Sequence, residues 1–313
     1  MHGGPVLPSS SGETTPDWSQ LQQDVLVGIL SRLDLPDLVC SVAVCSPWRL
    51  SYLAVRRFGL CSPAQSPYLV YSSGDRDGST ATLHSLATDR RYHLPLPDPP
   101  FRRRYVVGSS RGWLAAADER SNLHLLNPVT GAQLLAGHSV THLDVRPPGV
   151  GGSGGADFYP PDKTRFFLYQ KVVLSSSDPA GGDCTVVIKH RPWDPLSFAR
   201  VGDDDRWTWI HNMKRCDRYD DVFYDDHDRL FYAVRNTGEV HAVDLNGPAP
   251  MLKVILNLNT EIGVGCDFHY LLRAPWGDLL QIRRLYSAPP QVQGLLDQFG
   301  LLQNLDQDRD GPA

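Results

Sequence analysis

The apolar residues of this 313-residue chain change their spacing near residue 60, and the change divides the chain into two parts. Before it, Leu21, Val25, Ile29 and Leu33 recur every four residues, which is the spacing of a helical face. From about residue 68 the period shortens toward two, which is the spacing of strands. The sequence therefore predicts a short helical segment followed by an all-β region.

Helix start signals occur three times within residues 17–58. Asp17 precedes the first apolar stripe as an N-cap, Pro36 suits a first helical turn, and Ser46-Pro47 gives a cap followed by proline. A segment of this size cannot bury a stable core without help from a partner or a neighbouring domain. Its surplus of apolar residues favours a contact surface over an independent bundle.

The β region is rich in turns, because the chain has 27 Gly and 25 Pro. Strand units that repeat at intervals of tens of residues favour a β-propeller, and a β-sandwich is the competing all-β fold. The predicted strands cover residues 68–71, 80–86, 105–108, 113–117, 123–126, 165–174, 185–190, 207–210, 222–224, 230–234, 239–245, 252–256, 268–273 and 279–285.

Charge and cysteine usage narrow the function classes. The chain has 30 Lys and Arg against 35 Asp and Glu, a net charge of −5, so no global attraction to nucleic acid or to an anionic membrane is expected. None of the six cysteines forms a C-x-x-C pair, which predicts free thiols in a reducing compartment. No stretch reads as a signal peptide or a membrane helix, so we expect the cytoplasm or nucleus.

Residues 17–58 resemble an F-box, and the stretch 44–49 (Val-Cys-Ser-Pro-Trp-Arg) is the most specific part of the match. Trp18 and Leu35 also match, whereas Gln22 stands where the family commonly has proline. The resemblance implies contact with a Skp-type adaptor and through it with a cullin. The residues it assigns to adaptor binding are Leu21, Val25, Leu26, Ile29, Leu30, Leu33, Leu38, Val44, Cys45, Trp48 and Arg49.

Residues 68–286 resemble the C-terminal domain of plant F-box proteins with a KIB-type β-propeller. The resemblance rests on Gly112-Trp113-Leu114, on Asn127-Pro128-x-Thr130-Gly131, and on the blocks 232–244 and 270–280. It implies the substrate-recognition subunit of a Skp–cullin–F-box ubiquitin ligase, a non-catalytic subunit that holds an unknown protein target. A propeller enzyme or ligand sensor with an unrelated helical cap, and a degenerate F-box protein, remain open alternatives.

The chain is thus expected to be an α+β multidomain protein, a small three-helix F-box followed by a β-propeller-like domain. Residues 1–16 are predicted to be disordered, 59–67 to be a linker and 287–313 to be an atypical tail. In that tail apolar residues recur at helical spacing: Val292, Leu295, Leu296, Phe299, Leu302 and Leu305. We therefore expect an incomplete last blade, partly covered by an amphipathic helix or a loose tail.

Several polar clusters are candidates for chemistry, and each has a simpler explanation. The acidic run 203–228 lacks the alternating oxygens, central glycine and distal glutamate of a calcium loop. Within it, Asp225–Asp228 lies between two apolar strands and is expected to form a turn. Arg102-Arg103-Arg104 reads as a solvated loop. His190, His211 and His227 accompany no nucleophile elbow or His-Glu-x-x-His motif, and they read as part of an aromatic cluster. No catalytic residue, cofactor site or metal site is predicted.

Overall fold

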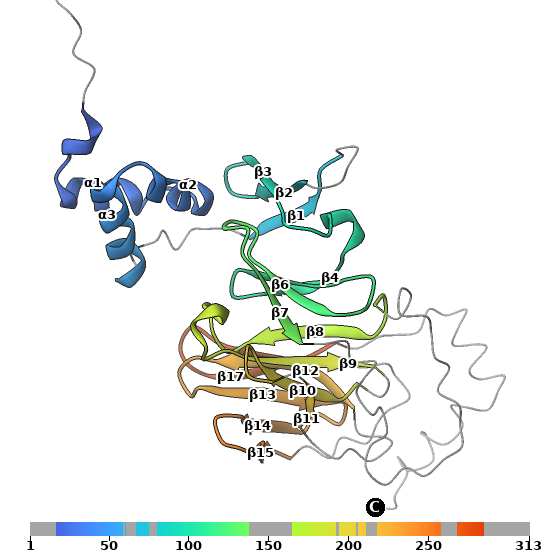
Figure 1. Cartoon of the computed structure of the whole chain (residues 1–313). Coiled ribbons are helices and arrows are strands. Elements are labelled where there is room, and N and C mark those ends of the chain that lie inside the picture. The colour runs from blue at the N-terminus through green and yellow to red at the C-terminus, as the bar shows by residue number, and fades with distance from the viewer. Residues whose placement is uncertain are drawn as a thin grey trace, which may run out of the picture. The chain divides into compact units, whose positions relative to one another are not determined.

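The computed structural model describes residues 17–58, 60, 67–74, 80–137, 165–191, 194–204, 206–210, 218–257 and 268–284 (Figure 1). The chain forms two compact units, one of residues 1–73 with 82–94 and one of residues 74–81 with 95–313. The predictions for 1–16 and 287–313, and most of the linker 59–67, fall outside the described residues.

The first unit begins with the three predicted helices, and that prediction is confirmed. They are α1 (Gln23–Leu30), α2 (Leu35–Cys40) and α3 (Ser46–Arg57), with 3₁₀ turns η1 (Trp18–Gln20) and η2 (Ser41–Ala43). Asp17 caps η1 rather than α1, because its carboxylate accepts the backbone N–H of Ser19 at 3.0 Å. Helices this short depend on tertiary packing for their stability.

A three-stranded sheet completes the first unit. Its strands are β1 (Tyr68–Ser72), β2 (Thr80–Ser85) and β3 (Arg91–Pro95), in the order β1-β2-β3. The sequence places a linker at 59–67, yet most of this sheet groups with the helices rather than with the sheets that follow.

The described residues of the second unit form four antiparallel sheets, three of them with four strands in chain order. After the turn η3 (Phe101–Arg103), their strands are β4 (Tyr105–Ser110), β5 (Trp113–Ala117), β6 (Leu123–Leu126), β7 (Gln133–Gly137), β8 (Tyr169–Leu174), β9 (Thr185–His190), β10 (Leu196–Arg200), β11 (Thr208–Trp209), β12 (Tyr219–Asp225), β13 (Leu230–Arg235), β14 (Val240–Asp244) and β15 (Met251–Leu256). The hairpin of β16 (Phe268–Arg273) and β17 (Leu279–Arg284) is the fourth sheet.

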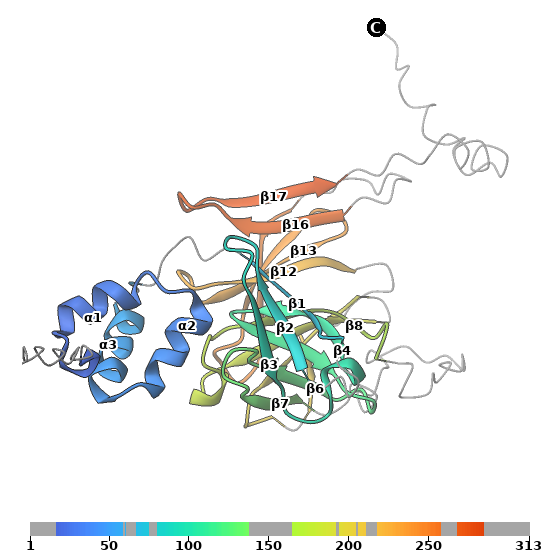
Figure 2. The ribbon, with the colours of Figure 1, turned by 90° about the horizontal axis from the view of Figure 1, so that it is seen from above.

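These sheets stack face to face, with the first strand of each beside the first strand of the next: β4 by β8, β8 by β12, and β12 by β16 (Figures 1 and 2). On β9, Val186 and Ile188 pack toward Trp113 of the preceding sheet, while Val187 packs toward Phe231 of the following one. A strand buried on both faces is apolar throughout rather than alternating. Stacked four-stranded sheets of this kind agree with the predicted β-propeller and not with a two-sheet sandwich.

The first hairpin turns of successive sheets meet at one end of this unit. Arg111 and Gly112 have positive φ angles of 52° and 81°, as a tight type I′ turn between β4 and β5 requires. From that turn the Arg111 side chain reaches Leu174 at the end of β8 and Asp226 in the β12–β13 turn.

Every predicted strand overlaps an observed one, but three strands were missed: β3, β7 and β10. β10 has the sequence Leu-Ser-Phe-Ala-Arg and is buried on both faces, so its small residues hide the alternation that a sequence pattern needs. The segment predicted as 165–174 begins with a turn, and β8 itself starts at Tyr169. No helix in the described ranges is long and apolar enough to span a membrane.

Candidate functional site

The three helices enclose a small core of their own. Leu30 of α1, Leu38 of α2 and Val55 of α3 are fully buried and pack together. The indole Nε1 of Trp48 donates a hydrogen bond to the carbonyl oxygen of Trp18 at 3.1 Å, which ties the N-terminal turn to α3. The module is therefore held by side chains from all three helices.

The residues predicted to bind an adaptor differ widely in exposure. Those in the interior are Leu26, Leu30 and Leu38. Those half-buried at the module's edge are Leu21, Ile29, Leu33, Cys45 and Trp48. Those exposed are Val25, Val44 and Arg49. A fully buried side chain cannot reach a partner while the module stays folded, so the three interior leucines hold the module together and do not form its surface.

Helix α3 carries apolar residues on two opposite faces. Trp48, Tyr52 and Val55 face the core of the module. Leu50 and Leu53, three residues apart on the other side, are 61% and 53% exposed. Neither was assigned to adaptor binding from the sequence, although the second apolar face is visible in the spacing. An exposed pair of leucines on a short helix is a surface suited to an apolar partner.

The β2–β3 hairpin binds the N-terminal end of α2. Arg90 Nη1 lies 2.5 Å from Asp37 Oδ2, while the hydroxyls of Thr88 and Tyr92 donate to Asp34 Oδ2 at 3.1 and 3.2 Å. Burial, then the charges of Asp37 and Asp34, raise the pKa of Tyr92 to about 12, which keeps its phenol a donor. The helices and this hairpin are thus joined by polar contacts within the first unit.

In the second unit, part of the acidic run forms the turn between β12 and β13, as predicted. Arg273 on β16 donates to Asp225 through Nε at 2.5 Å and to Asp228 through Nη2 at 2.7 Å. Arg111 donates to Asp226 at 2.7 Å. The carboxylates of this turn are therefore engaged by guanidinium groups of two other sheets.

Two further members of the run, Asp220 and Asp221, are buried on β12 and bind neighbouring sheets. Asp221 Oδ2 accepts the backbone N–H of Leu271 on β16 at 3.0 Å, and its other oxygen pairs with Lys171 on β8. Asp220 Oδ2 accepts the backbone N–H of His269 at 3.1 Å. These carboxylates link three sheets, a role that the turn interpretation did not foresee.

The histidine and cysteine side chains that the sequence analysis weighed as candidates for chemistry are next considered in their structural environment. The His190 ring on β9 lies 2.9 Å from Ser197 Oγ and meets the Trp209 ring edge-on, and burial lowers its pKa to about 4. His211 lies outside the described residues. Among the residues that the structure describes, no three His, Cys, Asp or Glu side chains are grouped to hold a metal ion, and the cysteines described are free thiols.

The run Arg102-Arg103-Arg104 is only partly exposed to solvent, which corrects the prediction that it forms a solvated loop. Arg102 and Arg103 are exposed, whereas Arg104 is 7% exposed. Arg104 Nε donates to the carbonyl oxygen of Pro99 and Nη2 to Gln133 Oε1, both at 2.8 Å. Burial lowers the pKa of Arg104. Its guanidinium anchors the proline-rich loop to the sheet.

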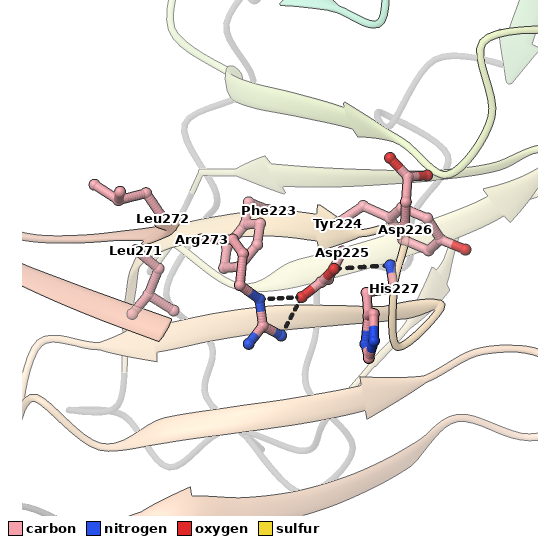
Figure 3. A pocket seen from close by; sticks show the side chains of 8 residues that line it. All are labelled: Phe223, Tyr224, Asp225, Asp226, His227, Leu271, Leu272 and Arg273. Carbon is pink, nitrogen blue, oxygen red and sulfur yellow. Dashed lines mark hydrogen bonds and ion pairs between the residues drawn. The ribbon is translucent and has the colours of Figure 1, made fainter. Parts of the chain in front are cut away.

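A cavity of about 460 Å³ opens beside the β12–β13 turn (Figure 3). Its lining comes from β12, the turn and β16: Phe223, Tyr224, Asp225, Asp226, His227, Leu271, Leu272 and Arg273. Figure 3 shows the guanidinium of Arg273 directed at Asp225 within this lining. Asp225 is paired with Arg273, and Asp226 with Arg111 outside the lining. What the cavity offers a ligand is therefore mainly aromatic and aliphatic surface, and its size is that of ordinary binding pockets.

Known proteins resemble this chain to different extents. An F-box/kelch-repeat protein of Arabidopsis thaliana is 28% identical over 119 residues, which cover 37% of this chain and only 30% of that relative. YCF48 bound to a D1 peptide aligns with 66% of this chain and 58% of its own, at 10% identity and a TM-score of 0.35. The dihydro-heme d1 dehydrogenase NirN aligns with 84% and 61%, at 10% identity and a TM-score of 0.36.

The model of the KIB1-4 β-propeller family matches residues 83–307. The match begins within β2, includes all four sheets of the second unit and leaves out the helices. It also continues to residue 307, whereas the sequence pattern predicts that the β-propeller-like domain ends at residue 286. Since the match covers well over half of the residues, the chain belongs to the KIB1-4 β-propeller family.

Proposed function

We propose that this protein is the substrate-recognition subunit of a Skp–cullin–F-box ubiquitin ligase. The helical module binds a Skp-type adaptor and through it a cullin, and the propeller domain binds a target protein. The chain forms and breaks no bonds itself and needs no metal or cofactor. It acts by raising the effective concentration of the target beside the ubiquitin-transfer machinery.

The observation that carries this proposal is the second apolar face of α3. The module already has a core in Leu30, Leu38 and Val55, so the exposed Leu50 and Leu53 are not needed to build it. Apolar side chains displayed by a small helical module are the pattern of a surface that packs against a partner's helices. Similarity to a plant F-box/kelch-repeat protein supports the same function.

The target side of the proposal rests on the end of the propeller domain where the hairpin turns meet. Turns and loops on a rigid scaffold are the usual carriers of recognition. The cavity beside Phe223 and Leu271 lies there, and its paired charges suit an apolar side chain of a target better than a charged one.

Co-purification of the full chain with a Skp-type adaptor and a cullin tests the proposal. We expect all three to purify together, and the double variant Leu50→Asp/Leu53→Asp to lose the adaptor while staying soluble. The same variant, used as bait, should enrich target proteins that the wild-type chain delivers for degradation. A wild-type chain that never retains the adaptor would refute the proposal.

A further inference from the structure

Trp276, in the turn between β16 and β17, is 72% exposed, more than any other large apolar side chain among the described residues. Its indole Nε1 donates a hydrogen bond to Asp278 Oδ2 at 2.7 Å, which fixes one edge of the ring. The backbone N–H of Gly277 closes the turn by donating to the carbonyl oxygen of Ala274 at 2.9 Å. A ring held in this way loses little conformational freedom when a partner covers it, and tryptophan is enriched among the residues that dominate interfaces.

The cavity described above lies directly beside this turn. Arg273, which lines the cavity, donates through Nη1 to the carbonyl oxygen of Gly277 at 2.9 Å. Leu271 and Leu272, the two residues before it on β16, also belong to the lining, as Figure 3 shows. One short stretch of chain thus carries both the apolar lining and the exposed tryptophan, so a single segment of a partner can contact both.

The turns at this end of the propeller domain carry mostly negative charge. The exposed charged side chains of the β8–β9, β12–β13 and β16–β17 turns are Asp178, Asp183, Asp226, Asp228, Arg229 and Asp278. Aspartates still outnumber arginines when the half-buried Arg111 and Arg273 beside these turns are counted. Hydrogen bonds from Tyr232 and then from His227 lower the pKa of Asp228 to about 2, so this carboxylate stays ionised.

These features together specify the chemistry of a partner. The aromatic and aliphatic lining of the cavity suits an apolar side chain. The face of an indole ring attracts the cation of a lysine or arginine, and Asp278 places a carboxylate at the edge of the Trp276 ring. An acidic segment would be repelled by the aspartates of the surrounding turns. Charge complementarity therefore favours a partner that is apolar at one position and basic beside it.

We propose that the surface formed by Trp276, Asp278 and the cavity beside Arg273 binds a segment of the target protein in which one apolar side chain is flanked by lysine or arginine. The apolar side chain enters the cavity, and the neighbouring cation lies on the Trp276 ring next to Asp278. This inference rests on the proposed function, because it names the class of target that the propeller domain holds.

Binding of short fluorescein-labelled peptide pools to the full chain tests the proposal. The first pool has leucine or phenylalanine at its centre with lysine or arginine on both sides. The second has the same centre with aspartate or glutamate on both sides, and the third has serine at its centre with lysine or arginine on both sides. We expect the first pool to bind at least about ten-fold more tightly than either of the others. Equal affinity for the first pool and either of the others would overturn the proposal.

Variants of the full chain locate the binding. Trp276→Ala should weaken binding of the first pool by at least about 30-fold, while Trp276→Phe keeps an aromatic ring and should retain most of the affinity. Asp278→Asn keeps an acceptor for the indole N–H but removes the charge, so we expect a loss of about three-fold. Glu119→Gln removes an exposed charge from the β5–β6 turn and should have no effect. Unchanged binding in Trp276→Ala would contradict the proposal.

Co-purification with a Skp-type adaptor, measured for the same variants, keeps the two proposals distinguishable. Trp276→Ala should retain the adaptor, because its helical module is unchanged. A chain that binds the first pool but never the adaptor would refute the ligase function alone, and the reverse result would refute this surface alone. Self-association of the wild-type chain that Trp276→Ala abolishes would also contradict the inference, because a second copy would then occupy the surface.

Discussion

The guanidinium of Arg111 donates a hydrogen bond to the carboxylate of Asp226 at 2.7 Å, although 115 positions separate the two residues. The same group donates to the carbonyl oxygen of Leu174 at 2.8 Å and lies 5.1 Å from the ring centre of Tyr224. One arginine in the β4–β5 turn thus holds the turns of three sheets together.

Replacing Arg111 tests that role. Arg111→Asn keeps a residue that tolerates the positive φ of this turn but removes all three contacts. We expect the free energy of unfolding to fall by about 1–2 kcal/mol, most of it from the half-buried bond to Leu174. The exposed Arg120→Asn should change it by less than about 0.5 kcal/mol. Urea denaturation of both variants measures the difference, and equal midpoints would contradict the assignment.

Asp221 is expected to be the member of the acidic run on which stability depends most. Asp221→Ala leaves the Leu271 N–H buried without its acceptor and Lys171 without its partner, so the unfolding free energy should drop by about 3 kcal/mol. Asp203 belongs to the same run but is exposed, and Asp203→Ala should cost less than about 0.5 kcal/mol. Similar melting temperatures for the two variants would show that the link between sheets is unimportant.

His190 should make the propeller domain sensitive to acid. Burial lowers its pKa from 6.5 to about 4, so between these values the unfolded chain binds a proton that the folded chain does not. Stability is therefore lost as the pH falls from about 6.5 to 4, by on the order of 3 kcal/mol. His190→Gln should flatten this pH dependence, while the exposed His227→Gln should preserve it. Denaturant unfolding curves recorded between pH 4 and 7 measure this dependence. If the free energy of unfolding of His190→Gln varied with pH as it does in the wild type, the prediction would be refuted.

The strand pattern was predictable where a strand is strongly apolar or alternates clearly. β9 is an unbroken apolar run and was located from the sequence, because burial between two sheets demands it. β10 is also buried, but two of its buried positions hold the small residues Ser197 and Ala199, so its composition gives no apolar signal. Such residues are determined by tertiary packing, and the local sequence pattern does not reveal them.

The candidate sites were predictable only in part, for a related reason. The apolar stripe of residues 17–58 was recognised, but periodicity alone does not tell the core side of a helix from an exposed apolar side. Leu30 proved to be core and Leu50 surface. The cavity depends on Arg273 meeting Asp225 across 48 positions, and nothing in the sequence near either residue specifies that pairing.

We predict that Leu30 is required for the folding of the three-helix module. Leu30→Asp buries a charge beside Leu38 and Val55, so we expect the three helices to unfold and adaptor binding to be lost with them. Far-UV circular dichroism should show a loss of helix, with the β signal retained. A variant that keeps its helices would place Leu30 outside the core and contradict the structure.

The most direct test is the affinity of the full chain for a purified Skp-type adaptor, measured by calorimetry for wild type, Leu53→Asp and Gln23→Asp. Leu53 and Gln23 are both exposed, so neither change should unfold the module, and both add the same charge. The account predicts that Leu53→Asp weakens binding by at least about 30-fold, equivalent to about 2 kcal/mol, while Gln23→Asp binds like wild type. Wild-type affinity in Leu53→Asp would contradict the account.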